Sequence, residues 1–100
     1  MAGQYASAGL RLEFHPTAAL IDCGEAHVLR PYAVENLADR IVVTINNAGG
    51  AVPLTLQGDG ALAGSGAIDV AGRVVTGTDA NGAIFATRNV RCAVGVLAAR

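Results

Sequence analysis

The sequence contains no tryptophan and no lysine, and it has only two phenylalanines and two tyrosines among 100 residues. Proteins that bind single-stranded nucleic acids stack bases on aromatic side chains and hold the phosphates on a positively charged surface. Here seven arginines are spread along the chain against eight acidic residues, which leaves a formal net charge of -1. Nucleic acid is therefore not expected as a partner.

Long hydrophobic runs are also missing. No stretch of 18 or more apolar residues occurs, so no transmembrane helix is predicted. The hydrophobic fraction of 52% includes many alanines, and the expected core consists of leucine, isoleucine, valine and the few aromatic residues. A chain of this length has room for one core, so residues 1–100 are expected to form a single domain.

The sequence does contain short stretches in which apolar and polar residues alternate, most clearly over residues 41–46. Such alternation predicts half-buried β-strands. Glycine-containing turn sequences separate these stretches, and pairs such as Asn-Gly and Gly-Gly supply the positive φ that tight hairpins require. The predicted turns lie at Ala48–Gly50, Gly58–Gly60, Ala71–Gly72 and Asp79–Gly82.

This pattern predicts an all-β fold of eight or nine short strands joined by tight turns. An open sheet of that size would leave edges exposed, so closure is expected. We predict a small antiparallel up-and-down meander that closes into a barrel of about eight strands, with a two-sheet β-sandwich as the alternative. Parallel pairing is confined to a contact between the first and last strands, because no connection is long enough to return a parallel strand.

Several positions refine this prediction. Pro31 within residues 27–36 indicates an edge strand or a bulge, and a helix over residues 31–40 is the competing interpretation. Gly64 and Gly66 fall on the inward face of residues 61–70 and indicate a sharp bend of the strand. Near the end of the chain, one face is predicted to carry Val90, Cys92, Val94 and Val96.

Cys23 and Cys92 are the only cysteines. If the first and last strands are neighbours, a disulfide between these residues would tie the sheet shut and stabilise the fold by about 4 kcal/mol in the chain-entropy model. Disulfides persist in oxidising compartments, so this interpretation implies an extracytoplasmic setting. The alternative is that both thiols are buried as small apolar groups.

Metal sites are weakly indicated. Cys23, Glu25 and His27, with Cys92 as a fourth ligand, resemble a zinc-binding set, but Gly24 interrupts the strand and the usual short-loop ligand spacing is absent. Asp59, Asp69 and Asp79 recur near turns, where calcium would accept their oxygens. Aspartates in turns are also explained by hydrogen bonds to their own backbone. No metal and no cofactor is therefore expected.

Catalytic groups are similarly sparse. His15 would act as a general base only if Glu13 or Asp22 oriented it, and no nucleophile accompanies them in sequence. The glycines from Gly58 to Gly64 do not have dinucleotide-binding spacing, because the third glycine comes one residue late and no helix follows. The chain is therefore predicted not to be an enzyme.

Several motifs give the chain a family resemblance. They are residues 3–7, 9–14, 22–26, 31–36, 64–66 and 72–77, together with Cys92 and Gly95. On these motifs the chain resembles small domains of uncharacterised bacterial secreted proteins. The resemblance implies an independent, disulfide-bearing β domain and no assigned activity.

Taken together, these features predict a non-catalytic binding or accessory module of a secreted or periplasmic protein, whose partner is a small apolar molecule or a protein. A small barrel is either filled by side chains or holds one ligand, and a filled core is favoured here. The residues that would line an apolar cavity are Leu12, Phe14, Val43, Ile45, Leu54, Leu56, Leu62 and Ile68.

Two other functions remain open. The first is self-assembly into a symmetric homo-oligomer, through a strand edge or an apolar outer face that carries Val42, Val75 and Phe85. The second is an enzyme that uses a histidine–carboxylate pair built on His15 or His27.

Overall fold

The computed structural model describes residues 2–24, 26–47 and 50–100. All regular elements of this part of the chain are strands, and they form one antiparallel sheet in the spatial order β4-β3-β2-β1-β9-β8-β7-β6-β5. The bounds are β1 Gly3–Ala6, β2 Arg11–Phe14, β3 Ala19–Cys23, β4 Ala26–Arg30, β5 Tyr32–Asn36, β6 Ile41–Asn47, β7 Gly50–Leu56, β8 Leu62–Asp79 and β9 Gly82–Ala99. The predicted all-β, antiparallel fold is confirmed.

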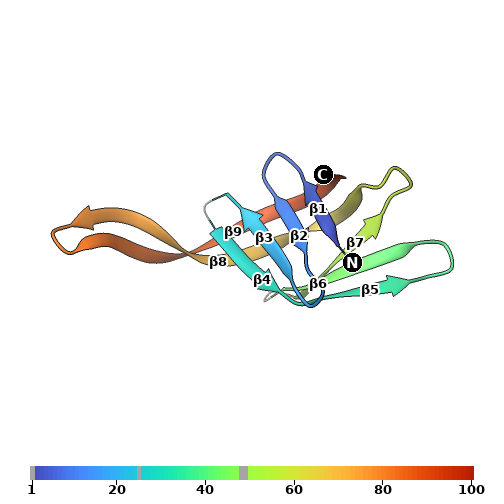
Figure 1. Ribbon diagram of the computed structural model, residues 1–100, viewed down its shortest axis with the longest axis horizontal. Helices are drawn as coiled ribbons and strands as arrows, with labels where there is room; N and C mark the ends of the chain where they lie inside the picture. The colour runs from blue at the N-terminus through green and yellow to red at the C-terminus, as the bar shows by residue number, and fades with distance from the viewer. Residues whose placement is uncertain (1, 25, 48–49) are drawn as a thin grey trace.

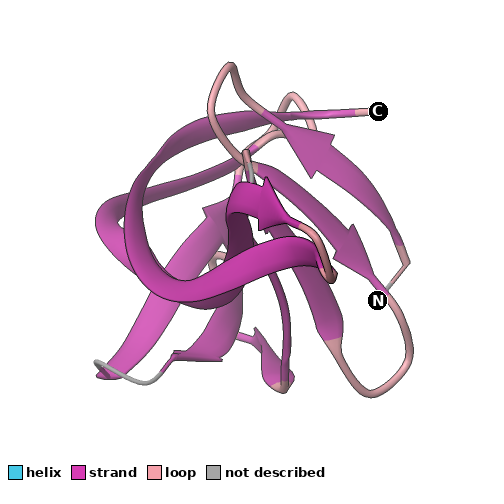
Figure 2. Cartoon of the chain, turned by 90° about the vertical axis from the view of Figure 1, so that its left-hand side faces the viewer, coloured by secondary structure: helices cyan, strands magenta, loops and turns pink. Residues whose placement is uncertain are grey.

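The sheet curves into a nearly closed barrel whose strands surround a common interior (Figure 2). Its two edge strands, β4 and β5, are consecutive in the chain and meet at Pro31. The Pro31 carbonyl accepts a hydrogen bond from the backbone N–H of Asn46, at 2.9 Å. Residues 27–36 therefore form one extended segment that bends at its proline, and the alternative helix over residues 31–40 is not adopted.

This bend also decides how the two ends of the chain pair. The chain continues from β4 into β5 without reversing (Figure 1), so the two strands count as one and the barrel has eight such segments. With an even number of up-and-down segments, the first and last run in opposite directions. The contact between β1 and β9 is antiparallel, through Tyr5 with Ala99 and Ala6 with Ala98. The parallel contact that the sequence left open does not form.

The predicted inward face of most strands is confirmed by burial. Leu12, Ile45 and Leu54 are fully buried in one continuous core that draws residues from both ends of the chain. Each alternate apolar side chain on β2, β3 and β6 points into this core, and its neighbours point outward. Burial of one face of β2, β3 and β6 thus specifies the register of these strands.

The sequence prediction is wrong about the number of strands after residue 60. Residues 61–70 and 73–78 were expected as separate strands with a turn at Ala71–Gly72, but both belong to β8. Residues 83–87 and 90–97 likewise belong to β9. Ala71 and Gly72 pair across the ladder with Asn89 and Arg88, so the strand continues where a turn was expected. The reversal at Asn81–Gly82 is confirmed, with Gly82 at φ 119°.

Half of the β8–β9 hairpin projects from the barrel (Figure 1). The last ladder pair with a buried side chain is Val70 with Val90, and we call residues 71–89, which lie beyond this pair, the arm. The arm gives the molecule its elongated shape, with extents of 59 × 23 × 23 Å.

The prediction is also wrong for one residue of β9. The sequence predicts Val96 on the same face as Val94, but Val94 is buried while Val96 is 64% exposed, and Leu97 is fully buried instead. Gly95 lies between them at φ 60°, a left-handed conformation that glycine adopts without strain. This residue interrupts the period-two alternation, so the inward face passes from Val94 to Leu97.

The predicted bend at Gly64 and Gly66 is confirmed as an irregularity in the β8–β9 ladder between Gly64 and Ala67. A Cβ atom on Gly64 would lie 2.9 Å from the Pro53 carbonyl oxygen and 2.9 Å from Leu54 Cδ2. A backbone oxygen cannot move aside as a side chain can. Glycine is therefore required at position 64 because β7 passes very close to β8 there.

We expect Gly64→Ala to lower the free energy of unfolding by about 1–3 kcal/mol, the usual cost of overpacking a core. Gly66→Ala is the matched control, because its Cβ would meet Val52 Cγ1 at an ordinary 3.6 Å. The control is expected to leave stability unchanged or raise it by up to about 1 kcal/mol. Urea unfolding of both variants measures the difference, and equal stability would contradict the close approach.

Candidate functional site

The interior of the barrel is a packed core. The eight residues predicted to line an apolar cavity all face this interior, where seven are buried and Leu56 is partly buried. They pack into or against the same core cluster: Leu12, Phe14, Val43, Ile45, Leu54, Leu56, Leu62 and Ile68. Phe14 also makes edge-to-face contacts with Tyr5 and Tyr32, with ring centroids 5.7 and 5.0 Å apart.

One apolar depression lies on the outside of the barrel. It has a volume of about 310 Å³ and lies where the chain bends from β4 into β5. Its lining residues are Pro31, Tyr32, Ala33, Thr44, Asn46 and Ala51. None of the eight predicted cavity residues is among them, because the bend at Pro31, rather than the barrel interior, creates this hollow.

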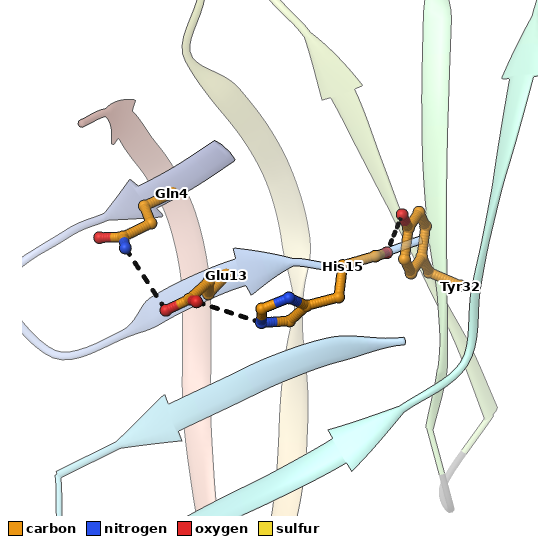
Figure 3. A network of polar contacts seen from close by, with 4 residues as sticks. All are labelled: Gln4, Glu13, His15 and Tyr32. Carbon is orange, nitrogen blue, oxygen red and sulfur yellow. Dashed lines mark hydrogen bonds and ion pairs between the residues drawn. The ribbon is translucent and has the colours of Figure 1, made fainter. Parts of the chain in front are cut away.

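Both histidines contact carboxylates on the surface. His15 Nε2 lies 3.1 Å from Glu13 Oε1, and the other oxygen of Glu13 accepts a hydrogen bond from Gln4 at 3.4 Å (Figure 3). The backbone carbonyl of His15 accepts a hydrogen bond from the Tyr32 hydroxyl. The structure thus brings His15 to Glu13, which the sequence offered as one of two partners.

The other carboxylate pairs with the second histidine. Asp22 Oδ1 lies 3.3 Å from His27 Nδ1. The side chains of His15 and His27 are 52% and 59% exposed, so water surrounds both pairs. Solvent weakens such pairs, and neither histidine lines the apolar depression. This geometry is that of solvent-exposed contacts between histidines and carboxylates.

The cysteines and aspartates that were considered as metal ligands have other partners. Cys23 and Cys92 are bonded to each other, which removes the two thiolates of the zinc interpretation, and Glu25 lies outside the described residues. Asp59 and Asp79 each accept a hydrogen bond from a backbone N–H two residues on, at 3.0 and 2.8 Å. No cluster of three potential ligands occurs in the described part of the chain.

Asp69, the third of these aspartates, lies on the part of β8 that belongs to the barrel, one residue before Val70. Its Oδ1 is 3.5 Å from Arg91 Nη1 on the paired strand β9. The three aspartates are therefore separate: one in the β7–β8 turn, one on the ladder and one at the tip of the arm.

The disulfide does not join neighbouring strands as expected. Cys23 is on β3 and Cys92 is on β9, and β2 and β1 lie between these strands in the sheet. Cys92 pairs with Ile68 across the β8–β9 ladder, two residues from the Val70–Val90 pair at which the arm begins. The bond thus ties the base of the arm to the far side of the short strands β1 and β2.

The arm exposes three large apolar side chains. Val75 is 59% exposed, Phe85 49% and Ile84 44%. Val75 and Phe85 pair across the ladder and so share one face, while Ile84, next to Phe85 in the strand, points to the other. Among the arm residues whose burial is described, Gly77 is half-buried and all the others are exposed. The arm therefore presents apolar groups on both faces.

Sequence reasoning named Val75 and Phe85 as an outer apolar face but missed the arm that carries them. Val42, which was grouped with them, is half-buried on β6 in the barrel. The available signal was the sequence from Ala83 to Ala86, four consecutive apolar residues beside a two-residue turn. Continuous apolar runs are typical of strands that are covered on both faces.

Comparison with known proteins finds no significant match to a family model, to a curated protein or to a solved structure. The resemblance to small domains of bacterial secreted proteins therefore stays a prediction. In the described residues no helix is long and apolar enough to cross a membrane.

We expect the double substitution Cys23→Ser and Cys92→Ser to lower the free energy of unfolding by about 4 kcal/mol, because the bond closes a loop of 69 residues. Chemical denaturation measures this loss, and reduction of the unaltered protein should reproduce it. Thiol titration of unfolded protein purified without reductant should find no free thiol. Two titratable thiols per chain would contradict the disulfide.

Proposed function

We propose that this chain is a non-catalytic interaction module of an exported protein, in which the barrel is a rigid base and the arm is the binding element. The projecting arm with its exposed Val75, Phe85 and Ile84 is the observation that supports this proposal most directly. An accessory module needs a stable base and an accessible binding surface, and the chain has both features.

The three exposed apolar groups of the arm lie outside the core cluster. The barrel core is complete without them, since the core cluster ends at Val70 on β8 and Val90 on β9. An isolated two-stranded ribbon is marginally stable in water, and a contiguous exposed apolar patch favours association. A partner that covers this surface would remove its apolar groups from water and would stabilise the ribbon.

Export is proposed on the disulfide. Cys23 and Cys92 form an intramolecular bond, and such bonds persist in extracytoplasmic compartments and are rare in reducing ones. The bond lies at the base of the arm, where it would limit movement of the arm relative to the barrel. A secreted or periplasmic location is consistent with this structural role.

A second candidate function is the binding of a small apolar molecule. The depression beside Pro31 and Tyr32, of about 310 Å³, supports it, because this volume falls at the lower end of those found for ligand sites. The exposed pairs of His15 and His27 with carboxylates do not add a catalytic proposal, since no described feature holds a substrate against them.

The proposed role of the arm predicts that its apolar groups contribute little to folding stability. We expect the double substitution Val75→Ser and Phe85→Ser to cost at most about 1 kcal/mol, the contribution of one cross-strand pair. Ile68→Ala, on the same strand within the barrel, should cost about 2–5 kcal/mol, because it leaves a cavity in the core.

Urea unfolding over a series of protein concentrations measures both effects. Association makes the unfolding midpoint depend on concentration, so the values extrapolated to low concentration report the single chain. A loss of several kcal/mol in the arm variant at that limit would show that Val75 and Phe85 are structural, and would overturn the proposed role of the arm.

A further inference from the structure

We infer that the arm binds the arm of a second copy of this chain, with the two arms antiparallel about a two-fold axis. This inference rests on the proposed function and deepens it by naming the partner. The position of its apolar pair is the observation that supports this inference, and the length and area of the arm set the extent and the strength of the contact.

The apolar pair lies at the midpoint of the arm. On β8 the arm runs from Ala71 to Asp79, and Val75 is four residues from either end. Phe85 pairs with Val75 across the ladder. When two identical arms overlap fully in antiparallel orientation, the two-fold axis passes through their midpoints. That axis would place each Val75–Phe85 pair against the same pair of the other copy, which is a self-complementary contact.

The length of the arm sets the extent of this overlap. The arm spans eight residue steps from Ala71 to Asp79, which at about 3.3 Å each give a length of about 26 Å. With full overlap, the tip of each arm would reach the base of the other. There the disulfide between Cys23 and Cys92 fixes the barrel end against which the tip would come to rest.

The area favours a weak dimer. A ribbon about 26 Å long and about 10 Å wide offers roughly 260 Å² on one face, so two apposed faces bury about 520 Å² before any contact between tip and barrel. Stable complexes bury about 1,200 Å² or more, and smaller interfaces are typical of transient contacts. We therefore expect a transient dimer that forms as the protein concentration rises and dissociates on dilution.

The absence of tryptophan from the chain makes a direct experiment possible. Phe85→Trp introduces a single fluorophore at the proposed axis. Its emission should shift to shorter wavelength, and its quenching by acrylamide should fall, as the protein concentration rises from sub-micromolar to about 100-fold higher. Val96→Trp is the matched control, because Val96 is 64% exposed on the same strand but lies in the barrel part of β9. Its emission should not change with concentration.

Sedimentation velocity tests the same inference without a fluorophore. The unaltered protein should approach twice the monomer mass at the highest concentrations. Phe85→Ser should weaken association at least tenfold, and Val96→Ser should associate like the unaltered protein. Circular dichroism of each variant verifies that the fold is retained, and Phe85→Trp keeps the inference testable if Phe85→Ser does not fold.

Two outcomes would overturn the inference. The first is an unaltered protein that stays monomeric, with concentration-independent emission of Phe85→Trp. The second is a dimer that survives Phe85→Ser but is lost in Val96→Ser, which would place the interface on the barrel. The first outcome would leave the arm as a binding element for another protein, because the stability of the Val75 and Phe85 variants tests that role separately.

Discussion

The disulfide between Cys23 and Cys92 closes the barrel where its hydrogen-bonded ladder is incomplete, and the arm depends on this closure. β9 is long, but it pairs with β1 only through Tyr5 and Ala6. Beyond these residues the chain leaves β1 and turns back into β2, so the ladder between β1 and β9 ends there. The bond from β3 reaches across and holds β9 at Cys92.

This closure lets one hairpin have two roles. The part of β8 up to Val70 and the part of β9 from Val90 onward belong to the barrel wall and contribute buried side chains to the core. Beyond that pair the same two strands continue as a ribbon without further strands beside them. The ribbon would be marginally stable alone. Its ladder is continuous with that of the barrel, so the barrel holds the two strands together at the base of the arm.

Much of the barrel could be predicted from the sequence because the deciding interactions are local. The alternation in Ile41–Asn47 predicts which side chains are buried, Pro31 predicts an edge strand or a bulge, and Asn81–Gly82 predicts a reversal. In each case the chemistry of one or two residues restricts the backbone strongly enough to decide the local structure. The register of the strands then follows from the need to bury one face.

The sequence predictions are wrong where residues distant in the chain determine the local backbone conformation. Ala71–Gly72 is compatible with a turn and with a ladder, and the ladder forms because Arg88 and Asn89 continue to pair with these residues. Gly95 also permits two conformations, and its left-handed φ, which places Val96 outside, accompanies the irregularity on the paired strand. Glycine restricts the backbone least of all residues, so a glycine alone does not reveal which conformation the fold selects.

The candidate site shows the same division. The cysteine pair could be recognised by its chemistry, but its route across β1 and β2 depends on the lengths of those strands. Val75 and Phe85 could be recognised as outward-facing, but the arm that separates them from the barrel could not be predicted once a turn was placed at Ala71. A turn there would have placed these side chains on the outer surface of the barrel wall and not on a projecting ribbon.

The continuous apolar sequence around Phe85 bears on function because it lies outside the core cluster. In a protein with a packed core, a run that alternates poorly is usually covered on both faces. In this chain all four residues of that run, Ala83 to Ala86, are exposed. An exposed apolar run on a ribbon that continues from a packed barrel is the feature from which the proposed binding role of the arm is argued.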